Sequence, residues 1–258
     1  FGGRGLLFAC SFAAIQVGRT LFVLYSLGRG HALTPNFLRI LCWLLVSSAF
    51  WIAGGLNEGE PRLVLWLLAV ACEYASPMAG FPVPGLERSR TSDWTIDGGH
   101  LAERCQLFVI VALGETVLAS GASLASAELW TPAVLLALLA TFVGTLAMWW
   151  LYFGTSSKDA TAAITRSDDP GRIGAYFHYV HAILIAGIIA TAVGNDLVLA
   201  HPDAYPATAQ AAVLLAGPVL YLLGSAVYKR VVYGVVPGSH LAGVLVLLAL
   251  VPVALVSD

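Results

Sequence analysis

The chain has 258 residues, of which 59% are hydrophobic and 11% charged, whereas about 25% of residues are charged in a typical soluble domain. The formal net charge of -2 comes from scattered acidic and basic residues, so no field of one sign suits nucleic acid. This composition predicts a polytopic membrane protein whose partner is the lipid bilayer, and it argues against a nucleic-acid-binding protein.

Eight apolar segments follow one another along the chain, and each is long enough to cross about 30 Å of hydrocarbon as a helix. Turns rich in Gly, Pro, Asn and Asp separate them, such as NEGEP after Leu56. The sequence therefore predicts an all-α fold, a polytopic transmembrane helix bundle that forms a single transmembrane helical domain over residues 1–258. The predicted spans are residues 5–27, 36–56, 61–81, 101–122, 131–154, 171–196, 207–228 and 239–256.

The Lys and Arg residues are distributed unevenly between the connections. The first, third, fifth and seventh connections hold most of them, whereas the opposite side has only Arg4 and Arg62. Because positive residues in short connections stay on the cytoplasmic side, we predict that these odd connections are cytoplasmic and that both ends of the chain are external. The chain begins with Phe1, and its first apolar segment has no cleavage-site pattern behind it. We therefore expect a fragment of a larger helical bundle that lacks upstream spans.

Five acidic, basic or histidine side chains lie well inside the predicted spans, away from their ends, where a charge costs about 2.5–3.5 kcal/mol at the bilayer centre and seldom faces lipid. Counting about 1.5 Å per residue from the cytoplasmic ends of the spans places most of them about 10–15 Å into the membrane. We therefore predict one intramembrane polar cluster in the cytoplasmic half of the bilayer. Its members are Arg19, Glu73, Glu115, His178 and His181.

A static role for the same residues is the alternative. Arg19 with Glu73 or Glu115 would then be an ion pair that fixes the register of the helices. His178 and His181 would only form hydrogen bonds with neighbouring backbone groups.

The fourth predicted span contains the most distinctive stretch, HLAERCQLFVIVALGETVLASG, from His100 to Gly121. Arg104 and Glu115 are eleven residues apart, about three helical turns, so they share a face of the helix. Gly114, beside Glu115, is predicted to let another helix approach closely.

Two pairs of residues at helical spacing are candidate metal ligands. His100 with Glu103 and His178 with His181 each lie three residues apart on one helix face. The first pair is predicted at the membrane surface and the second about two turns inside, so one metal ion would not reach both. We therefore predict no metal and no other cofactor.

The four cysteines, Cys10, Cys42, Cys72 and Cys105, each stand alone in or at the edge of an apolar segment. Because no CxxC pair occurs, we predict small reduced core residues without a disulfide or a zinc site. Most of the tryptophans are predicted to anchor helices at the membrane interface or to pack between them.

The stretch from His100 to Gly121 resembles the signature of the bacterial low-temperature-requirement A (LtrA) proteins, in which His-Leu-x-Glu-Arg precedes an apolar run and then Gly-Glu with small residues. Similar features elsewhere are Arg19 in VGRTLFVLYSL, Glu73 and Pro77 in EYASP, and the sixth span, YFHYVHAILIAGIIATAVG. The resemblance covers most of the chain and implies a multi-pass protein of the bacterial inner membrane with about a dozen helices and no settled activity. The family's opening segment, similar to Glu-Leu-Phe-Phe-Asp-Leu-Val-Phe, does not occur here, and three upstream spans would restore a cytoplasmic start.

Three functional classes remain open. The favoured class is a proton- or ion-coupled transporter or channel for protons or a small solute, in which Glu73 or Glu115 takes up the proton, His178 or His181 relays it, and Arg19 tunes the carboxylate. A structural or regulatory membrane component would use the same charges only as internal pairs. A membrane-embedded metal-dependent enzyme is the least favoured, because no GxSxG, no HExxH and no spaced Ser-His-Asp set occurs.

Overall fold

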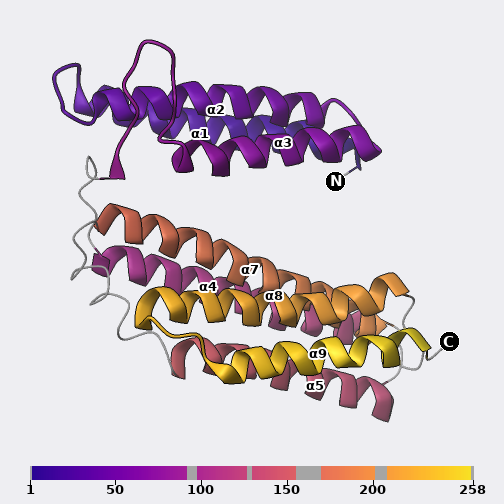
Figure 1. The fold of residues 1–258 in the computed structure, drawn as a ribbon. Coiled ribbons are helices and arrows are strands. Elements are labelled where there is room, and N and C mark those ends of the chain that lie inside the picture. The colour runs from indigo at the N-terminus through magenta and orange to yellow at the C-terminus, as the bar shows by residue number, and fades with distance from the viewer. Residues whose placement is uncertain (1, 92–97, 127–129, 155–169, 201–207, 257–258) are drawn as a thin grey trace. The chain divides into compact units, whose positions relative to one another are not determined.

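The computed structural model describes residues 2–91, 98–126, 130–154, 170–200 and 208–256, and every regular element in them is a helix (Figure 1). All eight predicted segments form helices, which confirms the all-α class. A short 3-10 turn, η1, precedes the first helix. The elements are η1 (Gly2–Arg4), α1 (Gly5–Leu27), α2 (Thr34–Gly55), α3 (Gly59–Met78), α4 (Gly98–Ser126), α5 (Pro132–Trp149), the π-helical turn η3 (Trp150–Gly154), α7 (Pro170–Ala200), α8 (Thr208–Tyr233) and α9 (Gly238–Val256).

Six of the described helices are long and apolar enough to cross a membrane: α1, α2, α4, α5 with η3, α7 and α8. Helix α3 contains three charged residues, Glu60, Arg62 and Glu73, and the apolar part of α9 is the shorter stretch Gly238–Pro252. The predicted spans in α3 and α9 stay predictions.

The chain divides into two compact units, Phe1–Trp94 and Thr95–Asp258. The first contains α1, α2 and α3, and the second contains α4, α5, η3, α7, α8 and α9. The single transmembrane domain expected from the sequence stays a prediction, and each unit is described here by itself.

In the first unit, α2 packs against both α1 and α3. The end of α2 meets the start of α1, where a Cβ on Gly55 would lie 2.9 Å from the Cα of Leu6, so the two helices are antiparallel and in backbone contact. Buried Ala9, Trp51 and Ala69 form the centre of this unit, and partly buried aromatic rings pack around them.

The connection after α3 is shaped by local sequence signals. The N–H of Phe81 donates to the carbonyl of Ser76 and the N–H of Gly80 to that of Pro77, the pair of bonds that closes a helix when a glycine of positive φ follows it. Gly80 has a φ of 71°. A tight turn follows in which the N–H of Leu86 donates to the carbonyl of Val83, with Pro and Gly between them as such turns prefer.

In the second unit, α7 and α8 are in backbone contact along their length, and glycines make this contact possible. A Cβ on Gly187 would lie 2.5 Å from the backbone nitrogen of Tyr221, and one on Gly217 would lie 2.5 Å from that of Thr191. Gly194 and Gly224 follow these two glycines by seven residues, and each also faces the partner helix closely. Small residues at such spacing let membrane helices approach in van der Waals contact.

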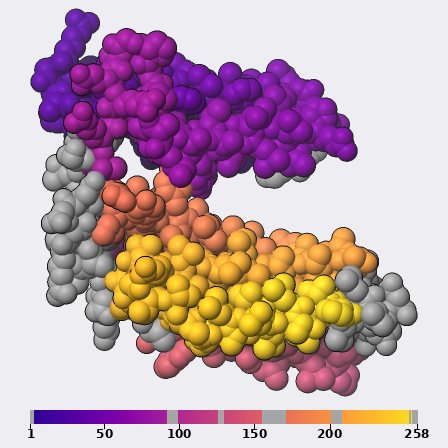
Figure 2. All heavy atoms as spheres, in the orientation of Figure 1, coloured from indigo at the N-terminus to yellow at the C-terminus, as the bar shows by residue number. Residues whose placement is uncertain are grey.

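The other helices of the second unit surround this pair. Helix α4 packs on α7, and α9 packs on α8. The golden residues of α8 and the yellow residues of α9 lie side by side in Figure 2. The hydroxyl of Ser123 on α4 donates to the carboxylate of Asp196 on α7. This hydrogen bond links the two helices.

The cysteines only partly match their predicted core positions. Cys105 is buried and Cys72 is half-buried, but Cys10 and Cys42 are exposed, and all four are free thiols. The core prediction is wrong for the two exposed residues because an apolar side chain on a membrane helix is also stable when it faces lipid.

Candidate functional site

Glu73 on α3 has two hydrogen-bond donors on α2. The hydroxyl of Ser47 and the indole Nε1 of Trp51 both donate to Glu73 Oε1, each over 2.9 Å. Ser47 and Trp51 are four residues apart, so they lie one above the other on the α2 face that packs on α3. Both donors are buried and Glu73 is half-buried.

Glu73 forms no ion pair with any described residue of the first unit. Arg19 is exposed on α1, and no ion pair joins it to Glu73. The second carboxylate oxygen, Oε2, has no hydrogen-bond partner among the described residues. The ion pair of Arg19 with Glu73 considered from the sequence is therefore not formed, and two neutral donors take its place.

Aromatic rings close the Glu73 site on one side. The ring of Trp66 lies against that of Trp51, with centroids 5.5 Å apart, and its Nε1 donates to the Trp51 carbonyl over 3.1 Å. The ring centroids of Phe12 and Trp51 are 5.0 Å apart. A Cβ on Gly54 would lie 2.4 Å from the Trp66 ring, so the absence of a side chain there admits the indole. The donor Trp51 is thus fixed by packing as well as by hydrogen bonds.

The second unit contains a buried pair, His181 on α7 and Tyr152 in the π-helical turn η3. The Nδ1 of His181 lies 2.7 Å from the carbonyl oxygen of Phe177, and its Nε2 lies 2.7 Å from the hydroxyl of Tyr152. A carbonyl only accepts, so Nδ1 carries a proton, and in the neutral ring Tyr152 donates to Nε2. Both ring nitrogens are satisfied, and His181 is 2% exposed.

The Tyr152 ring is part of an aromatic core. The ring centroid of Tyr228 on α8 lies 5.6 Å from that of Tyr152 and 5.4 Å from that of His181. The hydroxyl of Tyr221 donates to the Met148 carbonyl over 2.6 Å, close to where α5 changes into the π-helical turn. Such turns shift the backbone hydrogen-bond register by one residue, and a side-chain donor can satisfy a carbonyl near that shift.

The other predicted site residues are exposed within the second unit. Glu115 and Arg104 both lie on an exposed face of α4, which agrees with the face they were predicted to share, and His178 is exposed on α7. Among the described residues no hydrogen bond or ion pair joins Glu115 to His178 or His181, so the single cluster of Arg19, Glu73, Glu115, His178 and His181 stays a prediction.

His178 and His181 lie three residues apart, which is about 60° from alignment on a helix. This angle is enough for one ring to enter the core and the other to leave it. At the start of α4, His100 and Glu103 approach to 3.8 Å on the surface. No group of three or more His, Cys, Asp or Glu is placed to hold a metal in the part of the chain that the structure describes.

The predicted approach at Gly114 is not found within its own unit. A Cβ added at Gly114 would meet no described atom there within 4 Å. The closest approaches of glycine to the backbone of another helix in this unit lie instead between α7 and α8, at the pairs Gly187 with Gly194 and Gly217 with Gly224.

Another polar contact joins α8 to α9. The hydroxyl of Ser225 and the Nε2 of His240 are 2.9 Å apart, and both residues are buried. Lys229, one turn after Ser225, is also buried. The predicted span ends at residue 228, so Lys229 was expected in the connection after it, but α8 continues to Tyr233. A long aliphatic stem lets a lysine lie along an apolar helix surface.

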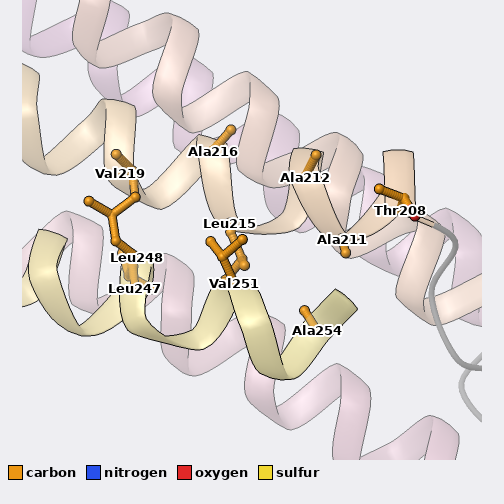
Figure 3. Close-up of a pocket in the computed structure, with 10 residues that line it drawn as sticks. All are labelled: Thr208, Ala211, Ala212, Leu215, Ala216, Val219, Leu247, Leu248, Val251 and Ala254. Carbon is orange, nitrogen blue, oxygen red and sulfur yellow. The ribbon is translucent and has the colours of Figure 1, made fainter. Parts of the chain in front are cut away.

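Helices α8 and α9 also line an open apolar pocket of about 390 Å³ (Figure 3). Leu215 and Val219 of α8 face Leu248 and Val251 of α9 across it, and Thr208 stands at one end. No titratable side chain lines the pocket, so it offers no acid, base or ligand for chemistry.

A family model supplies the comparison that decides the identity of the chain. The model of the bacterial low temperature requirement A protein (LtrA) matches residues 1–258. The chain belongs to the LtrA family. With six helices long and apolar enough to cross a membrane, this LtrA chain is an integral membrane protein.

A curated relative of this LtrA chain is the uncharacterized protein RA0937 of Rhizobium meliloti (strain 1021). The two are 43% identical over 251 residues, which are 96% of this chain and 61% of the relative. The chain therefore spans about three fifths of the length of that relative. No solved structure matches the LtrA chain.

Sequence reasoning on this LtrA chain missed the hydrogen-bond partners of half-buried Glu73 and of buried His181. The four-residue spacing of Ser47 and Trp51 indicates a polar face on one span, but it does not indicate which acid that face meets. Tyr152 gave no such signal, because its position depends on the π-helical turn, and an aromatic residue in an apolar span is otherwise expected to pack.

Proposed function

We propose that this LtrA chain belongs to a proton- or ion-coupled transporter or channel of the bacterial inner membrane, with Glu73 as its protonatable group. The observation that supports this most is the setting of Glu73. Glu73 lies within α3, and its carboxylate accepts hydrogen bonds from Ser47 and Trp51 on one oxygen and forms no ion pair with a described residue of its unit.

Neutral donors suit a carboxylate that changes its state. An arginine partner would fix the negative charge, and breaking such a buried pair is costly. Two neutral donors satisfy Oε1 whether or not a proton or a small cation occupies Oε2. Ionisable residues inside membrane spans commonly form proton relays and ion pathways, and Glu73 fits that role.

The two histidines differ as candidate relays. His181 donates to a backbone carbonyl and accepts from Tyr152, so a proton leaving Nδ1 would have no acceptor beyond the Phe177 carbonyl. His178 is exposed on the same helix and is free of this constraint. We therefore assign the relay to His178, and keep Arg19 and Glu115 as further members of the proposed pathway.

A structural role is the second candidate, and one observation favours it. The hydrogen bonds of Glu73 join α3 to α2, and a carboxylate that only joins two helices would look the same. The two functions differ in whether removing the charge abolishes transport while the helices stay together.

The test uses the full-length protein in proteoliposomes that contain a pH-sensitive dye, with an imposed pH gradient and a panel of small solutes and ions. Glu73→Gln keeps an oxygen that accepts from Ser47 and Trp51, so the fold should remain while the proton site is lost. Glu60→Gln, in the first turn of the same helix, is the matched control. Glu115→Gln is compared in the same way with Glu103→Gln.

We expect a flux in the wild type that falls at least about tenfold in Glu73→Gln, the equivalent of about 1.4 kcal/mol, and stays unchanged in Glu60→Gln. Circular dichroism and gel filtration confirm that each variant is folded. A flux equal in Glu73→Gln and the wild type would contradict a carrier role for Glu73. Absence of flux in every protein would favour the structural role.

A further inference from the structure

Arg39 is a buried cation without an acidic partner in the described part of the chain. It lies in the second turn of α2, and 7% of its surface is exposed. Its Nη1 donates to Asn36 Oδ1, and its Nε is buried without any hydrogen-bond partner among the described residues. Because a buried guanidinium is normally paired with an anion, an anionic partner is missing from this arrangement.

The position of Arg39 strengthens the need for an anion. The first turn of a helix has a partial positive charge and free backbone N–H groups, and Asn36 and Arg39 follow directly after the start of α2 at Thr34. Asn36 is 4% exposed, and its side-chain oxygen is occupied by Arg39. Its amide nitrogen is therefore a second donor beside the guanidinium.

The connection after α3 lies next to this position. The indole Nε1 of Trp43 donates to the Pro82 carbonyl over 3.0 Å, and Trp43 is one helical turn after Arg39 on the same face of α2. Residues 79–91 contain Arg88 and Arg90 but only one acid, Glu87.

The opposite end of the unit has a different charge balance. The connection from α1 to α2 adds Arg29 and no acid to the α2 start. At the far end, around the start of α3, Glu58 and Glu60 stand beside Arg62. The end of the unit that holds Arg39 is therefore the positive one, which the positive-inside rule assigns to the cytoplasmic side.

We propose that Arg39 and Asn36 bind a phosphate group at the cytoplasmic end of the first unit. The planar guanidinium offers parallel N–H donors that match phosphate oxygens, and arginine is favoured wherever such bidentate recognition occurs. The start of α2 contributes its positive end to the same site. The phosphate belongs either to the headgroup of an anionic phospholipid, abundant on this side of the membrane, or to a soluble phosphate compound.

The experiment uses the full-length protein in maltoside detergent, which contains no phosphate, and follows thermal unfolding while a probe is added at constant ionic strength. One arm adds phosphatidylglycerol and the other adds inorganic phosphate. Asn36→Asp is the decisive variant, since its carboxylate would form an ion pair with Arg39 in place of the phosphate group. This ion pair should preserve the fold. Arg39→Gln removes the charge, and Arg29→Gln removes an exposed charge at the same end as the matched control.

We expect the wild type and Arg29→Gln to be stabilised at similar probe concentrations. Asn36→Asp and Arg39→Gln should need at least about tenfold more probe, because a hydrogen bond to a charged group is worth at least that factor in binding. Stabilisation by phosphatidylglycerol alone identifies a lipid headgroup, and stabilisation by inorganic phosphate identifies a soluble compound. If Arg39→Gln does not fold, Asn36→Asp decides. The proposal is overturned if neither probe stabilises the wild type or if Asn36→Asp responds as the wild type does.

Discussion

The polar sites of the two units differ in how completely their hydrogen-bonding groups are satisfied. In the second unit both ring nitrogens of His181 are bonded, and the Tyr152 hydroxyl that serves one of them is buried. In the first unit Glu73 uses one carboxylate oxygen and leaves the other without a partner among the described residues. A fully bonded pair fixes its helices, whereas a carboxylate with an unused oxygen can change its partner.

The packing of the two units shows the same contrast. In the second unit the backbones of α7 and α8 touch, and no side chain separates Gly187 from Tyr221 or Gly217 from Thr191. In the first unit α1 and α2 also touch, at Leu6 and Gly55, but between α2 and α3 the rings of Trp51 and Trp66 pack together beside the hydrogen bond of Trp51 to Glu73. Two helices in backbone contact can move little against each other, because no side chain between them can change its rotamer. Helices separated by a layer of side chains can move when those side chains change rotamer. We therefore expect the first unit to contain the working group and the second to be the rigid one.

The largest effect is expected from Gly217→Val. Its side chain would begin 2.5 Å from the backbone nitrogen of Thr191, so α7 and α8 would have to separate, and we expect a loss of about 3 kcal/mol or more. The measurement is thermal unfolding of the purified protein in detergent by circular dichroism. Gly121→Val is the matched control, because a Cβ there meets nothing within 4 Å. Equal unfolding midpoints for the two variants would show that the contact of α7 with α8 is not rigid.

An intermediate effect is expected from Tyr152→Phe. The ring and its packing remain, but Nε2 of His181 loses its donor in a buried place, and such interhelical hydrogen bonds in membrane proteins are worth about 0.6–1.7 kcal/mol. Tyr176→Phe on α7 is the control, since Tyr176 is 51% exposed. When the proteins are unfolded with increasing amounts of a denaturing detergent, the unfolding midpoint of Tyr152→Phe should lie below those of the control and the wild type. A midpoint equal to that of the control would mean that the buried pair adds nothing to stability.

The helices could be predicted from the sequence because each is an uninterrupted apolar run between turn residues. The predicted bounds of the first helix, 5–27, are those of α1 (Gly5–Leu27), and the others differ by a few residues at their ends. The largest shift is at α8, which continues to Tyr233 because the pattern of apolar residues gives no weight to the stem of Lys229. Hydropathy marks where a span lies, but it does not mark where its backbone hydrogen bonds stop.

The site could be predicted only in part. An ionisable residue inside an apolar segment is easily recognised in a sequence, so Glu73 and the histidines could be predicted as site residues. Their partners were not, since Ser47 and Trp51 depend on the register of α2 against α3, and Tyr152 depends on a π-helical turn. The register of one helix against another is set by side-chain packing. A single sequence does not show that register, except where small residues repeat along a helix.

The smallest effect on stability, and the sharpest test of the two histidines, is expected from His178→Gln. His178 is exposed on α7 and accepts no buried hydrogen bond like that of His181, so the substitution should change the unfolding free energy by less than about 0.5 kcal/mol. The matched change His181→Gln alters the bonds to Phe177 and Tyr152 and should cost about 1–3 kcal/mol. In the proteoliposome assay His178→Gln should lower the flux while the fold is intact, because a relay needs a group that can give up its proton. A large loss of stability in His178→Gln, with His181→Gln unaffected, would reverse the assignment of rigid and working groups within α7.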